Sequence, residues 1–180
     1  MQGLDAQDEK YEITNREIIV VCKDDKEVKI NSRAAALCGL LRDLLLADPN
    51  DQHSKFEVKK VGAASMRAIA AFAAHHVDKP YEKCTRPVRS SKIADFVKNA
   101  WDAEWVDALD DVTRIYDVVE AADFLRIDTV LDLCATKVCT LMWHKSPAEV
   151  KQALQLKEDI KEEDVKFFQW PNLNKNANKQ

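Results

Sequence analysis

The chain has 180 residues, of which 46% are hydrophobic and 32% charged, and its net charge is -4 at pH 7. This length suits one domain with an appendage, and the apolar share is ample for a core. The negative charge argues against nucleic acid as the main partner, because phosphate binding requires a basic surface. Only three glycines are present, too few for a glycine-rich phosphate loop. No apolar run approaches about 20 residues, so we expect no membrane span.

The cysteines indicate a reducing environment. Their number is odd, their spacings fit no disulfide framework, and the first ten residues are polar and acidic, unlike a secretory signal. We therefore expect a protein of the cytoplasm and nucleus. The five are Cys22, Cys38, Cys84, Cys134 and Cys139.

The first half of the chain predicts a small sheet with helices. Residues 1–15 lack apolar periodicity, so we expect a flexible tail. A β-branched run at 17–22, a polar turn and the alternating Val28 and Ile30 predict a hairpin. Ser32 is predicted to cap a short helix through Leu37, and a Leu-rich helix follows before Pro49. A third strand around 56–58 and a helix at 63–76 complete this half.

Residues 78–100 read as a basic loop, with a helical turn expected around Ile93, Phe96 and Val97. From 78 to 98 there are six basic and three acidic residues, whereas 102–132 holds ten acidic residues and two basic. The contrast has two interpretations. It is either a solvated loop beside a solvated helix face, or a surface that steers a charged partner.

The second half of the chain predicts helices. Asp110 or Asp111 can cap a helix at 112–125, and a second helix is expected at 128–143. The core stripe expected for the first of these consists of Val112, Ile115, Tyr116, Val119 and Ala122.

A capping box predicts where the next helix begins. Ser146 is the expected N-cap, Pro147 stands at the first helical position, and Glu149 can reach back to Ser146. A last helix is expected from Lys161, and the tail at 171–180 is expected to be disordered.

These last two helices are too short to be stable alone and carry few apolar residues. They either dock onto the domain or form an incomplete helical layer that another protein's helices complete.

The residues that could act in catalysis or bind a metal do not form a pattern typical of either kind of site. His75 and His76 are adjacent and point to different faces, and no other ligand pair has metal spacing. Cys134 and Cys139 do not share a helix face well, and core cysteines are common. No apolar pocket brackets two carboxylates of 102–132. We expect no catalytic site, no metal and no cofactor.

The order of motifs along 17–170 resembles the Skp adaptor of SCF (Skp–cullin–F-box) ubiquitin ligases. The hairpin, the Leu-rich helices, His75-His76, Trp101-Asp102 and Gln169-Trp170 stand in matching order. Elongin C, a relative, lacks the last two helices, and their presence here favours Skp. The match is strongest over Ala121-Ala122-Asp123-Phe124-Leu125, Ile127, Val130-Leu131-Asp132, Lys145-Ser146-Pro147-Ala148-Glu149-Val150 and Glu162-Glu163.

The resemblance implies an α/β (α+β) fold. A BTB/POZ domain would span 16–127, with a small three-stranded sheet, helices and the basic loop at 78–100 as an insert. F-box-binding helices would follow at 128–170. The implied function is that of a non-catalytic adaptor, which bridges F-box proteins to a cullin in an SCF-type E3 ubiquitin ligase.

The resemblance also implies which residues bind the two partners. The family motif Ala-Ala-Asn-Tyr-Leu touches the cullin with its Asn-Tyr pair, which is Asp123-Phe124 here. The residues expected to bind the F-box are Val138, Leu141, Met142, Val150, Leu154, Leu156, Val165, Phe168 and Trp170.

Departures from the family pattern support an alternative function. Asp123 places a charge where the family has a neutral amide, and the loop before Trp101 is basic instead of acidic. The alternative is a structural Skp-like subunit, partnered with an F-box protein in a kinetochore, ATPase-assembly or axonemal complex without ligase function. The exposed F-box surface also makes a homodimer of the free protein an expectation.

Overall fold

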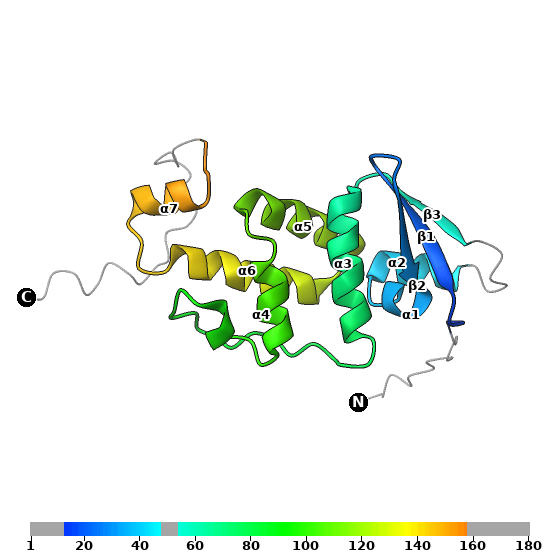
Figure 1. Ribbon diagram of the computed structural model, residues 1–180, viewed down its shortest axis with the longest axis horizontal. Helices are drawn as coiled ribbons and strands as arrows, with labels where there is room; N and C mark the ends of the chain where they lie inside the picture. Colours follow the sequence, from blue (N-terminus) through cyan, green and yellow to red (C-terminus); the bar gives the residue numbers. More distant parts are fainter. Residues whose placement is uncertain (1–12, 48–53, 158–180) are drawn as a thin grey trace, which may run out of the picture.

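The computed structural model describes residues 13–47 and 54–157. In this part of the chain a three-stranded sheet lies at one end and a short helix, α7 (Pro147–Ala153), at the other (Figure 1). The predicted α+β class and three-stranded sheet are confirmed. The expected tails, apart from 13–15, and the helix expected from Lys161 lie outside the described residues. No helix within the described segments is both long and apolar enough to cross a membrane.

The sheet is built around β1 (Glu17–Cys22), a run of β-branched residues. It pairs antiparallel with β2 (Glu27–Asn31) and parallel with β3 (Lys55–Val58), so the strand order is β2-β1-β3. Val20 lies opposite both Val28 and Phe56, and all three side chains are buried. The parallel pair needs a crossover connection, and two short helices lie between β2 and β3.

These two helices are α1 (Ser32–Ala35) and α2 (Gly39–Leu46), and the N-cap predicted for the first is wrong. Asn31 caps α1 by accepting the Arg33 N–H at 2.9 Å. Ser32 is the first helical residue; its buried hydroxyl donates to the Thr14 carbonyl at 2.7 Å. Asn and Ser are equally good caps, so this tertiary contact decides between them. The helix also ends at Ala35, before the expected Leu37.

Helix α3 (Ala63–His76) packs against the sheet on one side and α5 (Val112–Leu125) on the other. Met66 and Ile69 of α3 are fully buried in this contact. Asp111 caps α5 by accepting the Thr113 N–H at 3.3 Å, as one of the two predicted alternatives.

The core stripe predicted for α5 is partly wrong. Tyr116 is 38% exposed and Val119 only partly buried. The helix contacts both α3 and α6 (Asp128–Met142), so its buried side is broader and turned relative to the expected stripe. Its buried residues are Val112, Ile115, Val118, Ala121, Ala122 and Leu125.

Residues 78–98 form the expected connection, with the short 3-10 helix η1 (Ile93–Asp95) where a helical turn was predicted. Helix α4 (Ala100–Asp107) follows and contains Trp101 and Trp105, for which the sequence pattern predicts no helix. Asn99 caps it by accepting the Trp101 N–H at 3.1 Å, and the Trp105 indole donates to the Ala68 carbonyl at 3.1 Å. This bond joins α4 to α3.

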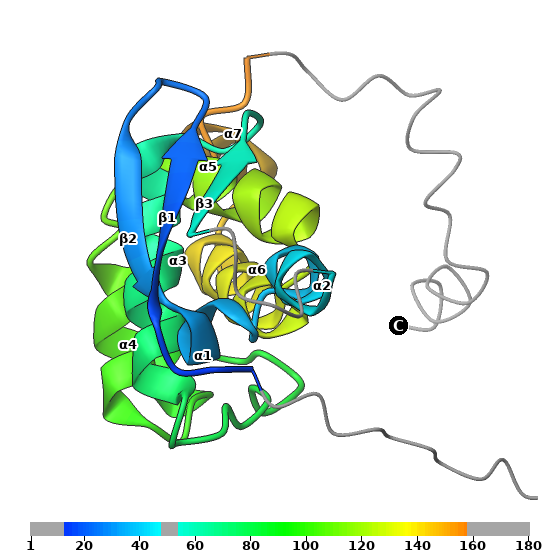
Figure 2. The same ribbon diagram turned by 90° about the vertical axis from the view of Figure 1, so that its right-hand side faces the viewer.

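Helix α6 completes the core, and Figure 2 shows it nearly end-on beside α2. Leu133 and Cys134 are fully buried and belong to the same cluster as the residues of the sheet. Thr136 and Thr140 are also buried; each hydroxyl donates to a carbonyl of its own helix at 2.7 Å. The predicted domain boundary after residue 127 falls at the turn between α5 and α6, across which the core is continuous, and the division stays a prediction.

Candidate partner-binding surfaces

The C-terminal half of α6 carries the first group of predicted F-box-binding residues. All three are partly buried: Val138, Leu141 and Met142. Val138 and Leu141 also pack against the hydrophobic core, whereas Met142 does not belong to that set. This end of the helix therefore leaves part of its apolar surface uncovered in the described structure.

The second group lies on α7 and just beyond it, next to α6. Val150 is partly buried, and Leu156 is 36% exposed. Leu154, however, is only 8% exposed. The structure therefore brings six predicted residues together on α6, on α7 and just after α7, with Leu154 turned inward. Val165, Phe168 and Trp170 lie outside the described residues.

The predicted capping box fixes the start of α7. The Ser146 N–H and hydroxyl donate to Glu149 Oε2 at 2.8 and 2.6 Å, and the Glu149 N–H donates back to Ser146 Oγ at 3.4 Å. The hydrogen bonds from the Ser146 hydroxyl and backbone lower the pKa of Glu149. With Pro147 at the first position, the helix start is determined locally.

The end of α7 is held by polar contacts with the start of α5. Gln155 donates to Asp111 Oδ1 at 2.9 Å and accepts from the Thr113 hydroxyl at 3.3 Å. The Tyr116 hydroxyl donates to the Leu154 carbonyl at 3.2 Å. None of the residues within α7 itself is buried. Helix α7 is thus attached at its end, and its own side chains contribute little to the core.

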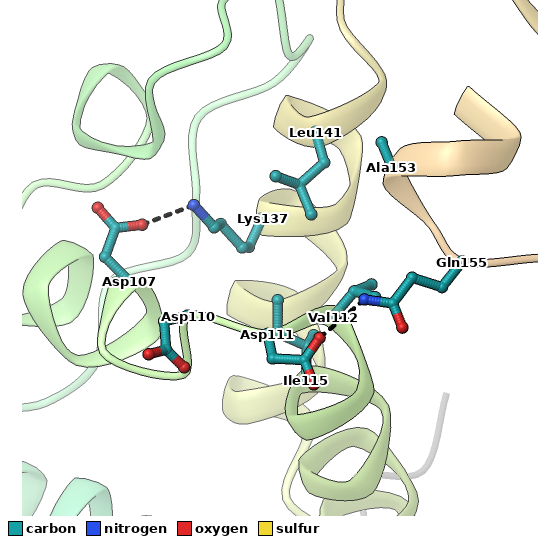
Figure 3. Close-up of a pocket in the computed structure, with 9 residues that line it drawn as sticks. All are labelled: Asp107, Asp110, Asp111, Val112, Ile115, Lys137, Leu141, Ala153 and Gln155. Atoms are coloured by element: carbon teal, nitrogen blue, oxygen red, sulfur yellow. Dashed lines mark hydrogen bonds and ion pairs between the residues drawn. The ribbon is translucent and has the colours of Figure 1, made fainter. Parts of the chain in front are cut away.

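A cavity of about 440 Å³ lies where the end of α7 faces α5 and α6 (Figure 3). Its apolar residues come from three helices, and its rim is charged. Lys137 donates to Asp107 at 2.7 Å, so part of that charge is compensated within the rim. Helices α5, α6 and α7 thus leave unfilled space in the described structure. The lining residues are Asp107, Asp110, Asp111, Val112, Ile115, Lys137, Leu141, Ala153 and Gln155.

The predicted cullin-binding pair lies at the end of α5. The Asp123 side chain is exposed and has no ion pair with any described residue. Phe124 is partly buried, and Lys60 Nζ lies 5.3 Å from the centroid of its ring. This geometry is that of a cation–π contact. The sequence did not indicate Lys60, because the contact joins the loop after β3 to a helix that is distant along the chain.

The histidines and cysteines considered as candidate metal ligands or reactive groups make packing and hydrogen-bond contacts within the fold. His76 is buried, with Nε2 at 2.9 Å from Asp102 Oδ1 and Nδ1 at 2.7 Å from the Lys79 carbonyl. The His75 ring stacks on the Trp101 ring, with 3.9 Å between the ring centroids. Burial raises the pKa of the Cys134 thiol to about 12, which disfavours the reactive thiolate. Among residues 13–47 and 54–157, no three His, Cys, Asp or Glu side chains gather as metal ligands do.

Comparison with known proteins identifies relatives over much of the chain, although no family model matches it. The S-phase kinase-associated protein 1 homolog of Tetrahymena thermophila is 29% identical over 141 residues, covering 78% of this chain and 82% of that protein. The Skp1-related protein of Caenorhabditis elegans is 25% identical over 126 residues, 69% of each chain. SKP1-like protein 13 of Arabidopsis thaliana is 32% identical over 101 residues, covering 52% of this chain and 66% of that protein.

Proposed function

Since the chain is a divergent member of the Skp family, we propose that it is a non-catalytic adaptor of an SCF-type E3 ubiquitin ligase. In this role it binds an F-box protein through α6 and α7 and a cullin through the end of α5. It works in the cytoplasm and nucleus, and the five cysteines, all free, fit the reducing environment there. In the absence of an F-box protein, two copies of the chain pair through the same apolar surface.

The observation that carries the proposal is the incomplete packing of α7. A helix of seven residues is not stable by itself, yet α7 buries none of its own residues and stands over a cavity bounded by α5 and α6. Leu141 and Ala153 line this cavity, and Leu156, three residues after Ala153, is exposed. Apolar helices of a partner would fill the space and cover the surface, as in a standard interface of about 1,600 Å².

The cullin side of the proposal rests on Phe124, an aromatic ring at the surface end of α5. Such rings supply much of the energy of many interfaces. Here an exposed carboxylate, Asp123, stands beside the ring and Lys60 lies over it. Both charged groups must lose water when a partner covers them. We therefore propose that cullin binding is weaker than F-box binding.

Calorimetric titration tests the two sides separately. The purified full chain is titrated with a purified F-box segment and, in a second experiment, with the N-terminal domain of a cullin. We expect binding of both, with the weaker affinity for the cullin. Val150→Glu should abolish F-box binding, whereas Gln152→Glu on the exposed side of α7 should not. Equal losses in the two variants, or no binding by the natural chain, would remove the F-box assignment.

The exposed charge of Asp123 favours a second candidate function. If that charge prevents cullin docking altogether, the chain is a structural subunit that partners an F-box protein in a non-ligase assembly, such as a kinetochore, ATPase-assembly or axonemal complex. The same titration separates the two functions. F-box binding without any cullin binding supports the structural subunit, and binding of both proteins supports the ligase adaptor.

A further inference from the structure

The basic insert, residues 78–98, is fixed onto α6 by one carboxylate. Asp132 Oδ2 accepts hydrogen bonds from the Tyr81 hydroxyl and the Cys84 N–H, each at 3.0 Å. Asp132 Oδ1 accepts a third from Arg86 Nη2 at 2.7 Å. Three donors from one short stretch of the insert thus meet a single side chain of α6.

The second half of the insert is fixed as well. The Thr85 N–H donates to the Phe96 carbonyl at 2.8 Å, which ties the two halves together. Cys84, Ile93 and Phe96 are buried. The insert, which connects α3 to α4 (Figure 1), is therefore held at several points along its length.

Two of the three carboxylates of the insert form ion pairs within the protein. Asp78 forms an ion pair with Arg33 at 3.1 Å, and Glu82 pairs with Lys98. Only Asp95 has no ion pair with a described residue. Four cations of the insert are exposed and likewise without an ion pair in the described part of the chain: Lys79, Lys83, Arg89 and Lys92. The surface of the insert is therefore strongly positive, although the whole chain has a net charge of -4.

We propose that the basic insert is a docking surface for an acidic segment of another protein. Cations on a fixed frame bind an acidic chain at a smaller entropy cost than cations on a loose loop. A nucleic acid fits less well, because the neighbouring stretch 102–132 holds ten acidic residues and two basic, and it repels a long polyanion. A short acidic segment can contact the insert alone. The proposal is independent of F-box and cullin binding.

The experiment measures binding of a fluorescein-labelled deca-glutamate peptide to the full chain by fluorescence anisotropy. The test variant combines Lys83→Gln, Arg89→Gln and Lys92→Gln. The control variant, Lys23→Gln with Lys145→Gln and Lys157→Gln, removes the same net charge from exposed residues outside the insert. A ten-nucleotide oligo-dT is the competing probe. Amide NMR shifts of the natural chain during titration locate the peptide without any substitution.

We expect the natural chain and the control variant to bind the peptide equally, and the test variant to bind about tenfold more weakly, since exposed ion pairs each change affinity by up to about fivefold. Binding should weaken steeply with added salt, and the largest shifts should fall within 78–98. Equal losses in both variants would reduce the effect to net charge and overturn the proposal. So would oligo-dT binding as tight as peptide binding, shifts that lie elsewhere, or no binding.

Discussion

Removing the Asp132 side chain should detach the basic insert from α6. In Asp132→Ala the Tyr81 hydroxyl, the Cys84 N–H and the Arg86 guanidinium all lose their acceptor. An unsatisfied buried donor costs about 1–3 kcal/mol. Arg86 is 51% exposed and remains solvated, so its ion pair contributes at most about 1 kcal/mol. We expect Asp132→Ala to lower the free energy of unfolding by about 2–4 kcal/mol.

Asp132→Asn should lower the free energy of unfolding by less, about 1 kcal/mol. The amide oxygen of the asparagine can still accept hydrogen bonds from Tyr81 and Cys84, while the charge facing Arg86 is lost. Urea unfolding followed by tryptophan fluorescence measures both values. The matched control is Asp117→Ala on the exposed side of α5, which should change stability by less than about 0.5 kcal/mol. An alanine variant as stable as the natural chain, or a control as damaging as Asp132→Ala, would refute the role given to this carboxylate.

The stability from Asp132 should also depend on pH. Burial opposes its ionisation, but the hydrogen bonds from Cys84, Arg86 and Tyr81 outweigh burial, so its pKa is lowered below the ordinary value of 3.8. A carboxylate with a lowered folded-state pKa stabilises the fold above its unfolded value, and this stability is lost as the pH falls through the folded value. The difference in unfolding free energy between the natural chain and Asp132→Asn should therefore reach its full value at about pH 7 and shrink below about pH 4. A difference in unfolding free energy that stays constant down to about pH 2 would contradict the lowered pKa of Asp132.

Four further substitutions test other parts of the structure. Leu133→Ala should lower the unfolding free energy by about 2–5 kcal/mol in urea titrations, because this side chain is fully buried in the core. Ser146→Ala should speed amide exchange within α7 roughly two- to tenfold and leave global unfolding nearly unchanged. Leu156→Ala should weaken F-box binding severalfold in calorimetry without loss of stability, as Leu156 is exposed. Asp123→Asn should strengthen cullin binding in the same assay, and a weaker complex would contradict the proposed charge effect.

The sequence predicted the elements whose signals are local. The β-branched run of β1 and the helix at 63–76 are confirmed, as is the capping box at Ser146. Each depends on residues within a few positions of one another, so the pattern alone is sufficient. The prediction of Ser32 as the N-cap of α1 is wrong because the Ser32 hydroxyl bonds to Thr14, 18 positions away along the chain, and Asn31 caps the helix instead.

The remaining features depend on tertiary contacts that no local pattern contains. Asp132 gave no signal of its role, since its three donors lie 46 to 51 positions away. Thr136 and Thr140 are buried polar residues, which a search for apolar faces passes over. At the candidate site, the sequence placed the uncovered apolar surface on the end of α6 and on α7. It gave no indication of the cavity between these helices and α5, or of Lys60 over Phe124.

Hydrogen–deuterium exchange of the full chain, free and saturated with a purified F-box segment, tests the central claim most directly. If the partner's helices cover the end of α6 and α7, residues 147–156, which include the unburied α7, should exchange quickly in the free protein, and residues 138–156 should become more protected in the complex. The sheet should be protected equally in both. An α7 already protected in the free protein, or protection that appears only outside 138–156, would contradict the account.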